Sequence, residues 1–122
     1  MPVIQVWCLP EGISEKDFIN LFNDIVSAVV EVRELGLKDM HDMTILFPPD
    51  RMRYGLGEDI IIEISKLFDK PERTAEVRNR LAGKVGGVIK KYFPDAYVEC
   101  FVETFDPQSP KVGFWASNKE DV

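Results

Sequence analysis

The chain has 122 residues, of which 45% are apolar and 30% charged, and its formal net charge is −6 at pH 7. This length suffices for one domain with a hydrophobic core. The acidic balance excludes a protein that grips nucleic acid through clustered lysines and arginines. No apolar run is long enough to cross a bilayer, and the first residues lack the basic region and apolar core of a secretory signal. We therefore expect a cytoplasmic, single-domain protein.

Proline is the second residue, and an apolar run that predicts a buried strand, Val3–Leu9, follows it directly. If Met1 is removed, Pro2 becomes an N-terminal secondary amine. Free α-amino groups titrate near neutrality, and an apolar pocket lowers the pKa of an amine further. Pro2 could then act as a general base near pH 7. If Met1 is retained, the nitrogen of Pro2 is an ordinary tertiary amide and has no such role.

A helix is predicted to follow this strand. Ser14 and Asp17 resemble a capping box, and apolar residues recur at helical spacing from Phe18 to Val32. Gly36 is expected to end the helix as a left-handed cap.

The middle of the chain predicts two strands separated by a turn. Met43–Phe47 is the second predicted strand, and Asp59–Ser65 is the third. The turn between them, residues 51–57, carries two arginines, Arg51 and Arg53.

The second half repeats this order. A helix is expected to open at Pro71-Glu72 and to end at residues 93–95, and Tyr97–Phe105 predicts a long strand. Val112–Trp115 is expected to form a last short strand, and residues 118–122 a flexible tail. Two adjacent glycines inside the helix, Gly86 and Gly87, cost roughly 1 kcal/mol each relative to alanine. A close contact between helix and sheet would explain them.

The chain is thus strand–helix–strand twice, with a period of about 56 residues and pseudo-repeats near residues 2–55 and 58–115. Two right-handed βαβ crossovers predict an α/β (α+β) domain over residues 1–117, in which a four-stranded mixed sheet carries both helices on one face. Strands such as the one containing Ile60–Ile62 look apolar on both faces. We therefore expect another subunit to cover the open face of the sheet.

Other kinds of reactive site find little support in the sequence. Cys8 and Cys100 fit neither a metal spacing nor a disulfide framework, so we interpret them as buried, reduced thiols. His41, the only histidine, has no acidic or thiol partner at a catalytic spacing and is interpreted as a surface residue. The sequence contains no Gly-rich phosphate loop, nucleophile elbow or metal motif. Neither a metal nor a cofactor is expected.

Several short motifs stand in a characteristic order. They are Met1–Val6, Phe47–Met52 followed by Tyr54-Gly55, Pro94-Asp95 and Lys111–Phe114. Lys38 lies twelve residues before Asp50. Together with the duplicated βαβ unit, these motifs resemble the tautomerase superfamily over about residues 2 to 117, and the macrophage migration inhibitory factor-like group most. The small 4-oxalocrotonate tautomerases resemble only the first βαβ unit and its terminal proline.

This resemblance implies a homotrimer whose sheets face the trimer axis, with an active site around Pro2 near a subunit boundary. The implied activity is keto–enol tautomerisation of a small α-keto acid similar to phenylpyruvate, without metal or cofactor. Pro2 would take and return the proton. Lys38 would hold the substrate carboxylate or polarise its carbonyl group. A simpler interpretation of Lys38 is a cation favoured by the dipole at a helix end.

Four further residues are weaker candidates for substrate binding. The resemblance implies Phe114 and Tyr97 as apolar walls that keep the amine neutral. Arg51 and Arg53 could clamp a carboxylate from their turn. Alternatively, the arginines are merely solvated, and Phe114 packs between subunits.

Two other functions remain open. The chain could be a non-enzymatic trimer of the same fold that retains Met1 and binds a protein or a small molecule. It could also be a ferredoxin-like small-molecule sensor, which would form a dimer or a larger ring and place its ligand away from Pro2.

Overall fold

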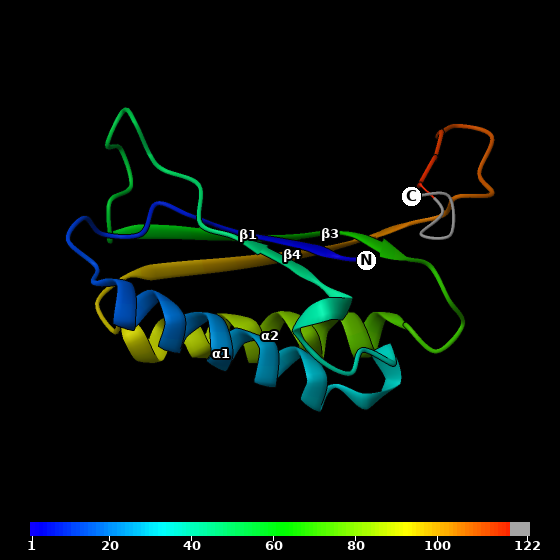
Figure 1. Ribbon diagram of the computed structural model, residues 1–122, viewed down its shortest axis with the longest axis horizontal. Helices are drawn as coiled ribbons and strands as arrows, with labels where there is room; N and C mark the ends of the chain where they lie inside the picture. Colours follow the sequence, from blue (N-terminus) through cyan, green and yellow to red (C-terminus); the bar gives the residue numbers. More distant parts are fainter. Residues whose placement is uncertain (118–122) are drawn as a thin grey trace.

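The computed structural model describes residues 1–117, so the tail predicted at 118–122 lies outside the described residues. A four-stranded sheet is covered on one face by two antiparallel helices (Figure 1). The elements, in chain order, are β1 (Val3–Trp7), α1 (Glu15–Glu31), the 3-10 turns η1 (Arg33–Leu35) and η2 (Met40–Asp42), β2 (Thr44–Leu46), β3 (Asp59–Phe68), α2 (Ala75–Tyr92) and β4 (Tyr97–Phe105).

The sheet has the strand order β2-β1-β3-β4. Strand β1 pairs in parallel with β2, and β3 pairs in parallel with β4, so each half of the chain is one βαβ unit. The central strands β1 and β3 are antiparallel, with Val3 opposite Ser65 and Trp7 opposite Ile61. The expected mixed sheet with both helices on one face is confirmed.

Helix α1 begins as predicted but ends earlier. The hydroxyl of Ser14 accepts a hydrogen bond from the amide of Asp17 at 3.1 Å, which caps the helix. The helix stops at Glu31, and Gly36 (φ 71°) instead caps the short 3-10 turn η1. The left-handed glycine was therefore predicted correctly, but the element that it ends was not.

Helix α2 begins later than expected from Pro71-Glu72. Its N-cap is Thr74, whose side chain accepts a hydrogen bond from the amide of Val77 at 3.3 Å. This hydroxyl accepts from one of the free amides of the first helical turn. Neither Pro71 nor Glu72 caps the helix in this way. Residues 70–74 are thereby left as a connection between β3 and α2.

Two strand predictions also need correction. Strand β3 continues three residues beyond Ser65 to Phe68, across an irregularity where Lys66 adopts φ 61°. Among residues 1–117 the strand expected at Val112–Trp115 is absent. The segment instead contacts the body of the protein through the ring of Phe114.

The core lies between the sheet and the helices. Ile4 and Val6 of β1 and the alternate isoleucines 60, 62 and 64 of β3 are fully buried there. They pack against the inward faces of α1 and α2, including Leu21, Ile25, Leu81 and Ile89. Alternation with a period of two aims these side chains at the helices and their neighbours at the other face.

The other face of the sheet is open and mixed in character. Tyr97 and Phe101 are 63% and 51% exposed on β4, and Ile61 of β3 is half-buried. Three exposed glutamates share this face, namely Glu63, Glu99 and Glu103. The expectation that the strands are apolar on both faces is therefore wrong in part. Both the β2–β3 loop and the segment after β4 rise on this open side (Figure 1).

No helix within residues 1–117 is long and apolar enough to cross a membrane.

The glycines of α2 are not required by packing. A Cβ atom at Gly86 would lie 3.8 Å from the Cβ atom of Cys100, an ordinary contact, and one at Gly83 or Gly87 would meet nothing within 4 Å. The expected close contact between helix and sheet therefore does not explain Gly86 and Gly87. Gly55 differs, because a Cβ atom there would lie 2.7 Å from the carbonyl oxygen of Asp59 and 2.8 Å from Cβ of Cys8.

A matched pair of substitutions tests this contrast. Gly83→Ala should raise the free energy of unfolding by about 1 kcal/mol, because alanine favours the helix and meets no neighbour. Gly55→Ala should lower it by about 1–3 kcal/mol, because the added methyl group overlaps backbone. Urea unfolding followed by circular dichroism measures both values. Equal effects of the two changes would contradict the packing described for the loop.

Candidate functional site

Pro2 directly precedes β1, at the end of the sheet where the α1–β2 and β3–α2 connections also lie. Its side chain is buried, and its carbonyl oxygen accepts a hydrogen bond from the amide of Thr44 at 2.9 Å. Met1 is exposed, and its sulfur accepts a hydrogen bond from the hydroxyl of Thr44 at 3.0 Å. The first two residues are thus fixed to the edge strand β2.

A cavity of about 360 Å³ lies beside Pro2. Three segments far apart in the sequence form its walls: the start of β1, the connection between α1 and β2, and the connection between β3 and α2. Its lining residues are Met1, Pro2, Gly36, Leu37, His41, Asp42, Phe68, Lys70 and Arg73. The cavity therefore combines Pro2 with two permanent cations, one histidine, one carboxylate and one aromatic ring.

Arg73 is the most deeply buried charged residue of this cavity, at 6% exposure. Its guanidinium donates to the carbonyl oxygens of Phe68 at 2.6 Å and Leu35 at 2.7 Å. Its Nε atom is buried and has no hydrogen-bond partner within the described residues. Burial lowers the pKa of Arg73, an effect that Glu72 opposes. None of the ion pairs found across residues 1–117 includes Arg73, so its charge favours an anion in the cavity.

The opposite wall is held by two bonds between side chains and backbone. The carboxylate of Asp42 accepts from the amide of Lys38 at 2.7 Å, and that of Asp39 accepts from the amide of His41 at 2.8 Å. These bonds shape the turn η2 and carry His41 and Asp42 to the cavity. Lys38, the predicted anion-binding residue, belongs to the same connection but does not line the cavity.

Phe114 lies at the end of the sheet that carries Pro2. Its ring packs edge-on against Phe68 with 5.2 Å between centroids, and Phe68 is part of the cavity wall. Phe105, the last residue of β4, completes this aromatic cluster. The predicted wall residue Phe114 therefore reaches the cavity only through Phe68.

Tyr97, the second predicted wall residue, lies at the opposite end of the sheet. It pairs with Asp59 at the start of β3, whereas Ser65, near the other end of that strand, pairs with Val3 next to Pro2. One chain alone does not bring Tyr97 to the cavity.

The two predicted arginines also lie at that far end, in the β2–β3 loop. Arg53 pairs with Glu11 at 3.0 Å, and both side chains are largely exposed. Asp50 organises the loop by accepting from the amides of Arg53 at 3.0 Å and of Gly55 at 2.9 Å. The bond from the Gly55 amide is the main cause that lowers the pKa of Asp50. Within one chain, Arg51 and Arg53 are not part of the Pro2 cavity.

The cysteines do not form a reactive site. Burial raises the pKa of Cys100 to about 12. Burial, and after it the carboxylate of Asp50, raises the pKa of Cys8. Both are free thiols, and neither is activated as a thiolate nucleophile.

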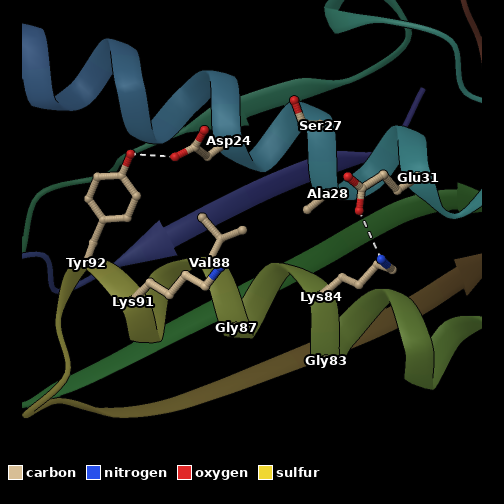
Figure 2. Close-up of a pocket in the computed structure, with 10 residues that line it drawn as sticks. All are labelled: Asp24, Ser27, Ala28, Glu31, Gly83, Lys84, Gly87, Val88, Lys91 and Tyr92. Atoms are coloured by element: carbon tan, nitrogen blue, oxygen red, sulfur yellow. Dashed lines mark hydrogen bonds and ion pairs between the residues drawn. The ribbon is translucent and has the colours of Figure 1, made fainter.

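A second cavity, of about 430 Å³, lies on the helical side between α1 and α2 (Figure 2). Tyr92 donates to Asp24 at 2.6 Å near one end of it, and Lys84 pairs with Glu31 at 3.0 Å near the other. Most charged side chains of this cavity are therefore already bonded to other lining residues, and small residues line the wall between the two bonds. No cluster of three or more metal-ligating side chains occurs in the part of the chain that the structure describes. The Pro2 cavity is therefore the candidate site.

Sequence reasoning missed Lys70, Arg73, His41 and Asp42 as lining residues of this cavity. His41 is exposed, as predicted for a surface residue. A usable signal for Lys70 and Arg73 was the predicted topology. If the strand after residue 58 runs antiparallel to the first strand, the connection that follows it must lie beside Pro2. For His41 and Asp42 the sequence holds no comparable signal, because the 3-10 turn that presents them depends on local side-chain bonds.

Comparisons with known proteins identify the fold. Neither a family model nor a curated protein matches the chain. Solved structures do match. A fused 4-OT (R7, wild type, asymmetric trimer) is similar over 98% of this chain and 97% of its own, at TM-score 0.69 and 14% identity. Macrophage migration inhibitory factor of Toxoplasma gondii is similar over 96% of both chains, at TM-score 0.63 and 16% identity.

Malonate semialdehyde decarboxylase is also similar, over 84% of both chains, at TM-score 0.57 and 13% identity. All three proteins are members of the tautomerase superfamily. At such low identities the likeness concerns the fold. The chain therefore has the fold of the tautomerase superfamily, as its motifs predicted.

Proposed function

We propose that this protein is a cofactor-independent keto–enol tautomerase of small α-keto acids, with Pro2 as the proton-transfer group after removal of Met1. One observation carries this proposal: the buried Pro2 borders a cavity whose wall contains the buried guanidinium of Arg73, which has no carboxylate partner among residues 1–117. A base and an anion-binding group thus share one space of substrate size.

The proposed reaction uses these groups in sequence. Lys70 and Arg73 hold the substrate carboxylate by charge-assisted hydrogen bonds. This places the carbon next to the keto group near the Pro2 nitrogen, which accepts a proton from it. The electron pair of that C–H bond moves into a carbon–carbon double bond, and the carbonyl oxygen takes up a proton to give the enol. In the reverse direction Pro2 returns its proton to carbon.

The apolar part of the cavity wall supports the base. Phe68 and Leu37 line the cavity, and burial in apolar surroundings disfavours the charged form of an amine. Pro2 is itself buried. A phenylpyruvate-like acid would place its ring against Phe68 and, through it, the aromatic cluster that includes Phe114.

We propose further that the protein is a homotrimer. Tyr97 and Phe101 leave large apolar surface on the open face of the sheet. The β2–β3 loop and the segment after β4 both extend on that side (Figure 1). Fused 4-OT proteins with the same fold are described as trimers. In such an assembly a neighbouring subunit would bring Arg51, Arg53 or Tyr97 toward the Pro2 cavity.

A second function is favoured by the position of Met1. Its side chain lines the cavity and is bonded to Thr44. A chain that keeps Met1 has an amide nitrogen at Pro2 and would be a non-enzymatic binding protein. The intact mass of protein purified from its native host distinguishes the two functions, because the enzyme requires loss of one methionine.

The Pro2 mechanism predicts a specific pattern of activity. One extra residue placed before Pro2 should lower kcat/KM for phenylpyruvate by about 10²–10⁴-fold, the usual contribution of a positioned base. Pro2→Ala keeps a free terminal amine, which becomes primary instead of secondary, and should lose less activity. Ultraviolet absorbance of the enol follows the reaction. If the extended form turns over as fast as the processed form, Pro2 is not the base.

The anion-binding wall predicts a difference between two lysines. Lys70→Met should lower kcat/KM about 10-fold, which is ~1.4 kcal/mol, because Lys70 lines the cavity. Lys38→Met is the matched control and should change kcat/KM less, because Lys38 does not line it. The opposite ranking would return the anion-binding role to Lys38.

The open sheet face predicts the assembly. Sedimentation equilibrium at micromolar concentration should give three times the mass of the chain, because exposed aromatic surface of this kind favours association. Phe101→Glu should shift the protein toward the monomer by adding charge to that face, while Met40→Glu, exposed on the turn η2, should not. A monomer for the unmodified protein would refute the proposed trimer.

A further inference from the structure

His41 stands apart from the other lining residues of the Pro2 cavity because it can both give and take a proton near neutral pH. It is the only histidine of the chain. Histidine side chains ordinarily titrate near pH 6.5. Lys70 and Arg73 are permanent cations at neutral pH, and Asp42 is an anion without a proton to donate. Apart from the Pro2 amine, His41 is therefore the one lining group suited to acid–base work.

The backbone that carries His41 is fixed. Its own amide donates to the carboxylate of Asp39 at 2.8 Å. The next residue, Asp42, accepts from the amide of Lys38 at 2.7 Å. The turn η2 is thus anchored on both sides of His41, which fixes the backbone from which its ring extends. A side chain on such an anchored turn is a better proton donor than one on a free loop, because less ordering is needed in the reaction.

The charges around His41 define its electrostatic setting. Asp42 from the same turn, Lys70 and Arg73 from the β3–α2 connection, and the first residues of the chain line the cavity with His41. Asp39 and Lys38 are its charged neighbours along its own connection. A substrate carboxylate bound at Lys70 and Arg73 would add a negative charge near the imidazole.

The proposed tautomerisation leaves one role without a residue. When Pro2 removes a proton from carbon, negative charge develops on the carbonyl oxygen, and a positioned donor must stabilise it. We infer that His41 is this donor, an inference that rests on the proposed function. The proton on the His41 imidazole passes to the carbonyl oxygen as Pro2 takes the proton from carbon. In the reverse direction the imidazole takes the enol proton while Pro2 protonates carbon.

Turnover tests this role directly. His41→Gln keeps a polar side chain and the backbone bond to Asp39, but it cannot transfer a proton. We expect kcat to fall about 10²-fold with little change in KM. A protonated His41 donor would give the pH profile of kcat/KM a descending limb, and this limb should disappear in His41→Gln. Met40→Gln, on the same turn but outside the cavity wall, is the control and should behave as the unmodified protein. An unchanged kcat and pH profile in His41→Gln would overturn the inference.

A binding experiment separates this inference from the proposed function. Benzoylformate is an α-keto acid that cannot enolise, and phenylacetate offers a similar ring and carboxylate without the keto oxygen. We expect benzoylformate to shift the His41 imidazole resonances in NMR and raise their titration midpoint more than phenylacetate does. This comparison needs no turnover, so it holds even if the protein proves inactive. Equal effects of the two acids, or no effect of benzoylformate, would overturn the assignment of His41.

Discussion

The antiparallel pairing of β1 and β3 is the constraint on which both the fold and the candidate site depend. It joins the two βαβ halves, because β1 and β2 belong to one half and β3 and β4 to the other. Its register places Ser65 opposite Val3, so the end of β3 and the connection after it lie beside Pro2. Arg73 then links that connection to the first half by donating to the carbonyl oxygen of Leu35. A parallel arrangement of these two strands would have separated Arg73 from Pro2.

The sequence predicted this fold well wherever side-chain periodicity carried the information. Strand β4 has the predicted bounds, Tyr97–Phe105, and α1 begins at its predicted cap. Errors arose where local backbone geometry overrode periodicity. Gly36 was correctly expected in the left-handed conformation but ends a 3-10 turn, and the apolar segment Val112–Trp115 is not a strand. The apolar character of that segment reflects the contact of Phe114 with Phe68, which alternation in sequence does not distinguish from a strand.

The candidate site was less predictable than the fold because most of it comes from connections. Pro2 was recognised from its position in the chain, which is a chemical property and needs no structure. The role of Lys38 was implied by the family resemblance, yet the cavity is lined by His41 and Asp42 from the same connection. The 3-10 turn η2 decides which of these residues lines the cavity. Its conformation depends on the carboxylates of Asp39 and Asp42, which accept hydrogen bonds from nearby backbone amides.

The burial of Arg73 shows how stability and binding are connected in this protein. A buried guanidinium loses its hydration, and two carbonyl oxygens replace it only in part, because the Nε atom has no hydrogen-bond partner among the described residues. An apolar residue would serve the packing between the two halves at lower cost in free energy. The same incomplete compensation supports the proposed binding of a substrate carboxylate at Arg73, because that group would supply the missing negative charge. In a chain of net charge −6, the local cluster of Lys70 and Arg73 would also draw the proposed anionic substrate to this cavity rather than to the rest of the surface. The cationic wall costs stability in the free protein, and a bound carboxylate would offset that cost. The same carboxylate would hold the proposed substrate beside Pro2, where the proton is transferred.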